Sequence, residues 1–73
     1  MRTQEVLNKI EGTNHKKTLE YKKAEIKRLE EAGYHLGVDS GKASIAGYVQ
    51  ALRDCGVITE SERRVLFIYY ATV

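Results

Sequence analysis

Residues 59–73, TESERRVLFIYYATV, decide between an all-helical fold and a fold that contains a strand. Residues 65–70 are mostly β-branched or aromatic, a composition typical of strands. Thr59, however, is followed three residues later by Glu62, which is the spacing of a capping box. In that motif the threonine hydroxyl and the glutamate carboxylate each accept a hydrogen bond from the other residue's main-chain N–H. Because a capping box begins helices, we predict a helix from Thr59 and an all-α fold.

Two helices are predicted before residue 33. Thr3 can cap a short helix that Gly12 ends. Residues 13–32 are rich in Lys, Glu, Leu and Ala, which favour helices, and Gly33 follows where a helix-ending glycine belongs. A continuous helix through Gly12 is the alternative, since one glycine costs only about 1 kcal/mol relative to alanine. We favour a break.

A third helix is predicted over residues 41–55. Its apolar residues recur at spacings of three, four and seven and so form one face, which is made of Ile45, Tyr48, Val49, Leu52 and Cys55. This pattern places Cys55 in the core. The residues before it, 34–41, contain two glycines, an aspartate and a serine, and we predict a linker there. We therefore predict one domain, residues 1–73, folded as a small bundle of three or four helices.

The composition excludes several classes of protein. One cysteine and two histidines among 73 residues allow no internal disulfide and too few ligands for a structural zinc, so we expect no metal and no cofactor. No apolar run approaches the roughly 18 residues of a membrane span, and no signal peptide is recognisable at the N-terminus. A single thiol suits a reducing compartment, so we predict a cytoplasmic protein.

No residue pattern predicts catalysis. The segment from Gly37 to Lys42 has three residues between its glycines and an alanine after its lysine, whereas a phosphate-binding loop needs four residues and a serine or threonine. His15 and His35 have no nucleophile or orienting group beside them in the sequence. We therefore predict a protein that is not an enzyme.

Nucleic-acid binding is the alternative function, and two elements could provide it. Lys16, Lys23 and Lys27 cluster on one side of the helix predicted over residues 13–32, although glutamates lie at the edge of that cluster. Residues 41–73 resemble a helix-turn-helix in outline, with Arg63 and Arg64 available for phosphate contacts. The helix that would read DNA begins with two glutamates, and the net charge is only +2. Both features make nucleic acid the less favoured partner.

The helix predicted from Thr59 is apolar around its whole circumference from residue 65 onward. The remaining chain has too few apolar residues to cover such a helix, and helices of this kind are normally buried. We therefore predict a protein interface that contains Leu66, Phe67, Tyr69, Tyr70 and Val73. The favoured partner is a second copy of the chain, and a different protein is the alternative.

A ridge of small residues on the third helix, Ala43, Gly47 and Ala51, is a weaker candidate for a contact surface. The function that we predict is a small protein–protein interaction or regulatory module. Adaptors and inhibitors, including those carried by mobile genetic elements, are the roles to which a domain of this kind is suited.

Overall fold

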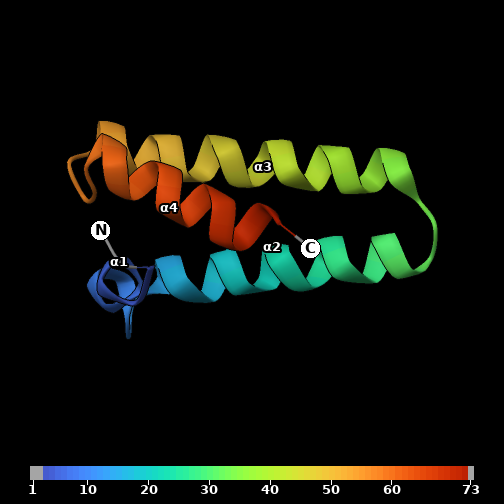
Figure 1. Cartoon of the computed structure of the whole chain (residues 1–73), viewed down its shortest axis with the longest axis horizontal. Coiled ribbons are helices and arrows are strands. Elements are labelled where there is room, and N and C mark those ends of the chain that lie inside the picture. The colour runs from blue at the N-terminus through green and yellow to red at the C-terminus, as the bar shows by residue number, and fades with distance from the viewer. Residues whose placement is uncertain (1–2, 73) are drawn as a thin grey trace.

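The computed structural model describes residues 3–72, which fold into four α-helices and no strand (Figure 1). They are α1 (Thr3–Ile10), α2 (Asn14–Glu31), α3 (His35–Asp54) and α4 (Glu60–Ala71). The long helices α2 and α3 form an antiparallel hairpin. Helix α4 folds back along the half of this hairpin that lies farther from the α2–α3 turn, and α1 packs at that same end. The predicted all-α bundle is confirmed.

Helices α1 and α2 are separate, as favoured from the sequence. Gly12 lies between them with a φ of +74°, a conformation that side chains rarely allow. Thr13 then caps α2, because its hydroxyl accepts a hydrogen bond from the main-chain N–H of Lys16 at 3.4 Å. The short connection lets α1 turn away from α2 and reach α4.

The linker predicted over residues 34–41 is wrong, because α3 begins at His35. The actual turn is centred on Gly33, which has a φ of +77°. Gly37 and Gly41 serve helix packing instead. A Cβ atom at Gly41 would lie 2.5 Å from Cγ1 of Ile26 on α2, and one at Gly37 would lie 3.0 Å from Cδ1 of Leu29. These glycines let the two helices approach closely.

The core lies between the hairpin, α4 and α1. From α3 it takes Ile45, Val49 and Leu52, so the predicted inner face of that helix is confirmed there. Cys55 is exposed, which corrects its predicted place in the core. The helix ends at Asp54, and Cys55 is its C-cap residue, so the helical spacing that pointed it inward no longer applies.

Helix α4 begins at the predicted capping box. The N–H of Glu62 donates to Oγ1 of Thr59 at 3.2 Å, and the N–H of Thr59 donates to Oε1 of Glu62 at 2.7 Å. Strand-like composition is thus overruled by two hydrogen bonds at the helix start. The side of α4 that is turned away from solvent packs against all three other helices.

Candidate interaction surface

The inner face of α4 is covered by its own chain. Leu66 is fully buried, and Tyr70 is only 1% exposed. Burial raises the pKa of Tyr70 to about 12, since the charged phenolate would lose its hydration. The sequence predicts that the chain cannot cover every side of this helix, and the structure covers this side while Ile68 and Tyr69 remain exposed on another. A partner of the folded monomer therefore cannot contact Leu66 or Tyr70 without unfolding the core.

The other predicted interface residues lie differently. Phe67 is half-buried and packs against the core, whereas Tyr69 remains 41% exposed. Its ring meets that of Tyr70 edge to face, with centroids 4.9 Å apart. Val73 lies outside the described residues. Tyr69 is thus the residue of the predicted set that the fold leaves most available.

A stripe that faces solvent runs along α4, and we call it the outer face of α4. Its exposed residues are Arg64, Ile68, Tyr69 and Thr72, and Val65 lies among them half-buried against the core, at spacings of three and four. Ile68 at its centre is 64% exposed, although an isoleucine normally favours burial. The predicted interface set omitted Ile68. Because residues 65–70 are apolar or aromatic on every side of the helix, no spacing in the sequence distinguishes Ile68 from the residues that are buried.

Lys23 of α2 holds one edge of this face in place. Its ammonium group donates to the main-chain oxygen of Tyr69 at 2.9 Å and lies 4.2 Å from the centre of the Tyr69 ring. The contact with the ring restricts the side chain of Tyr69, and the hydrogen bond satisfies one carbonyl at the end of α4. An aromatic side chain that is already ordered loses less conformational freedom when a partner binds.

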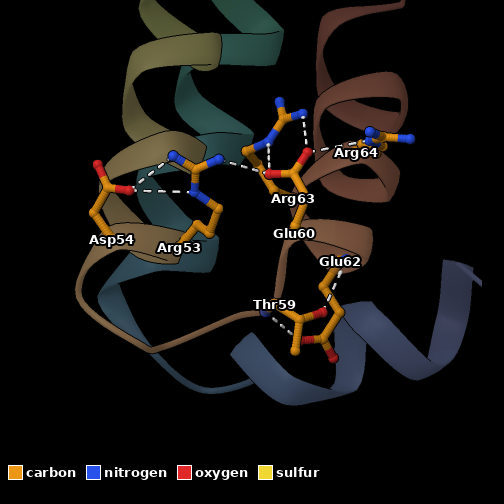
Figure 2. A network of polar contacts seen from close by, with 7 residues as sticks. All are labelled: Arg53, Asp54, Thr59, Glu60, Glu62, Arg63 and Arg64. Atoms are coloured by element: carbon orange, nitrogen blue, oxygen red, sulfur yellow. Dashed lines mark hydrogen bonds and ion pairs between the residues drawn. The ribbon is translucent and has the colours of Figure 1, made fainter.

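Three arginines converge on one carboxylate at the start of α4 (Figure 2). Glu60 accepts hydrogen bonds from Arg63 at 2.7 and 2.8 Å, from Arg53 at 2.8 Å and from Arg64 at 3.1 Å. Hydrogen bonds from Arg63 and Arg53 are the main reason why the pKa of Glu60 lies well below its usual range. Arg63 and Arg64, predicted as phosphate contacts, are therefore partly neutralised within the chain.

A second ion pair joins α1 to α4. Nζ of Lys9 lies 2.7 Å from Oε2 of Glu62, whose side chain is almost fully buried. The hydrogen bond from Lys9, together with the N–H of Thr59, lowers the pKa of Glu62. The capping glutamate thus also anchors α1. Nothing in the local sequence indicates this pairing, because the two residues are far apart in the chain.

The lysines of α2 do not form a free basic stripe. Nζ of Lys16 lies 2.6 Å from Oε2 of Glu11 and 3.9 Å from Oε1 of Glu20. The ammonium group of Lys23 donates to the main-chain oxygen of Tyr69. Lys27 is exposed, and among the described residues it forms no ion pair with Glu31, which lies four residues later. Of the three lysines predicted as nucleic-acid contacts, Lys27 alone has no ionic or hydrogen-bonded partner within residues 3–72.

The two histidines have different surroundings. Nδ1 of His15 lies 2.9 Å from the hydroxyl of Tyr48, a contact that links α2 to α3. His35 is exposed at the first position of α3. Within residues 3–72, no three histidine, cysteine, aspartate or glutamate side chains gather closely enough to hold a metal ion.

Comparisons with protein-family models, with curated proteins and with solved structures found no match to this chain. In the part of the chain that the structure describes, no helix is both long enough and apolar enough to cross a membrane.

Proposed function

We propose that this chain is a non-enzymatic protein–protein interaction module, of the adaptor or inhibitor type, that binds its partner through the outer face of α4. The observation that carries the proposal is the exposure of Ile68, 64%, at the centre of a stripe whose helix is packed on its other side. Burying such a side chain contributes about 1.5–3 kcal/mol. Tyr69 beside it adds a large ring with a polar tip, which is typical of protein interfaces.

The distribution of charge favours a protein partner over nucleic acid. Glu60 and Glu62 occupy the first turn of α4, where a DNA-reading helix would contact bases. Arg63 and Arg64 bond to Glu60, so phosphate contacts would first have to compete with an internal carboxylate. A cytoplasmic location belongs to the same proposal and is supported by the exposed thiol of Cys55, which oxidising compartments would modify.

Site-specific photocrosslinking tests the proposal. A photoreactive amino acid replaces Ile68 in one variant and Tyr21, an exposed residue of α2, in the control. We expect a discrete crosslinked protein species from position 68, in the cells that make the chain, and none of the same mass from position 21. Ile68→Asp should abolish binding of that species while circular dichroism shows an unchanged helix content. Identical products from both positions, or binding that survives Ile68→Asp, would contradict the proposal.

A salt titration tests the nucleic-acid alternative. If phosphate contacts dominated binding, affinity for duplex DNA would fall steeply with salt concentration. Replacing Lys16, Lys23 and Lys27 with glutamine would then abolish binding while the fold remained intact. We expect partner binding to survive substitution of Lys16 and Lys27, because these two residues lie outside the stripe centred on Ile68, whereas Lys23 contacts Tyr69 within that stripe.

A further inference from the structure

We infer that α1 is exchanged between two copies of this chain, with Gly12 as the hinge. In the structure a bend at Gly12 docks α1 across the end of its own bundle, against α4 (Figure 1). When the hinge straightens, α1 continues α2 as one helix and docks in the same place on a second copy, whose own α1 docks in return. This inference goes beyond the proposed function and does not depend on it, because α1 is anchored at the buried side chain of Glu62, whereas Ile68 is exposed.

Three residues of α1 anchor it to the bundle. Val6 and Ile10, four positions apart, are both buried, and Nζ of Lys9 lies 2.7 Å from Oε2 of Glu62. Within residues 3–72, Glu62 is the one charged residue that is buried, and a buried carboxylate needs a cation beside it. A helix of eight residues, such as α1, is not stable alone in water. It is therefore helical only when docked, on its own chain or on another.

The docking contacts are the same in both forms, because an exchanged helix repeats on the second copy the contacts that it made on its own. The two forms differ at the connection, residues 11–13. In the bent form the hydroxyl of Thr13 accepts a long hydrogen bond, 3.4 Å, from the N–H of Lys16, and Nζ of Lys16 lies 2.6 Å from Oε2 of Glu11. Straightening replaces these contacts with the main-chain hydrogen bonds of a continuous helix.

Gly12 sets the balance between the two forms. A Cβ atom at this position would meet no atom within 4 Å, so no close contact requires the glycine. Its φ of +74° does require it, because side chains disfavour that conformation. In a continuous helix the same position favours alanine over glycine. Gly12→Ala therefore disfavours the bent form and stabilises the straight one.

Light scattering coupled to size exclusion, over a range of concentrations, measures this balance. We expect wild type to have mostly the mass of one chain, 8.3 kDa, in the micromolar range. Gly12→Ala should raise the association constant of the dimer at least about 10-fold, since alanine is favoured in each of two straightened hinges. Gly47→Ala is the matched control, because it adds the same methyl group to an exposed position within α3 and should leave the association constant unchanged.

Photocrosslinking from position 9 identifies the exchanged helix. A photoreactive lysine analogue that keeps its ammonium group replaces Lys9, whose side chain reaches the first turn of α4. In wild type the crosslink to α4 should lie within one chain. In Gly12→Ala it should join position 9 of one chain to α4 of the other. Mass spectrometry of mixed isotope-labelled and unlabelled chains distinguishes the two.

If Gly12→Ala kept the mass of one chain at every concentration, or formed a dimer whose position-9 crosslinks stayed within each chain, the inference would be overturned. Thr13→Ala is the second variant, for use if Gly12→Ala loses helix content. It removes the cap of α2, keeps the glycine, and should raise the dimer fraction with the same interchain crosslink. Ile68→Asp should leave the Gly12→Ala dimer intact; its dissociation would show that the outer face of α4 forms the dimer, and would overturn the exchange of α1.

Discussion

Gly41→Ala and Gly47→Ala add the same methyl group to the same helix and should change stability in opposite directions. At Gly47 an added Cβ meets no atom within 4 Å, and the residue is exposed. At Gly41 the added Cβ would lie 2.5 Å from Cγ1 and 3.2 Å from Cδ1 of Ile26. Ile26 is fully buried and branched near its backbone, so its Cγ1 atom cannot move aside freely.

The expected magnitudes follow from these contacts. Alanine in a helix interior is favoured over glycine by about 0.5–1 kcal/mol, so Gly47→Ala should stabilise the protein by that amount. Gly41→Ala gains the same stability from helix propensity, but forcing an extra methyl group into a packed contact lowers the free energy of unfolding by about 1–3 kcal/mol. The free energies of unfolding of the two variants should therefore differ by about 1–3 kcal/mol. In a domain of this size, each kcal/mol shifts the melting temperature by about 4–8 °C.

Urea unfolding of both variants, followed by circular dichroism, measures the difference directly. Because the two changes share the same helix and the same chemistry, effects on the unfolded chain cancel between them. If Gly41→Ala stabilised the protein as much as Gly47→Ala, then the close approach of α2 and α3 would be wrong. The explanation of why residues 34–41 are helical would fail with it.

Three other predictions concern the capping box, the core and acid stability. Thr59→Ala removes the cap of α4 and should lower the free energy of unfolding by about 0.5–2 kcal/mol in urea titrations; a change within error would show that the helix begins elsewhere. Leu52→Ala leaves a cavity between α3 and its neighbours and should cost about 2–5 kcal/mol by the same measurement, whereas Leu36→Ala, at a side chain that is 75% exposed, should change stability by less than about 0.5 kcal/mol. The pKa of Glu62 is lowered in the folded state, so its contribution to stability is complete above its ordinary value of 4.5 and disappears as the pH falls through the lower folded value. Glu62→Gln should therefore make acid unfolding less steep in that range, and Glu31→Gln, on the exposed side of α2, should leave the profile unchanged; equal slopes for wild type and Glu62→Gln would refute the role of the pair with Lys9.

The helices and their ends were largely predictable, because the responsible interactions are local. The capping box joins Thr59 to a residue three positions away, and Gly12 and Gly33 end helices through their own backbone conformations. The apolar spacing of α3 likewise identified Leu52 and its neighbours as buried. Each of these signals is contained within a few turns of helix.

Tertiary contacts decided the rest. Whether Gly41 marks a turn or a close helix contact depends on Ile26, which belongs to a different helix. The exposed side of α4 likewise depends on where the hairpin and α1 pack, so Leu66 became core and Ile68 remained at the surface. A helix that is apolar on every side carries no periodicity to orient it. Its orientation is set by the packing of residues distant in the sequence, and these contacts leave no local pattern to read.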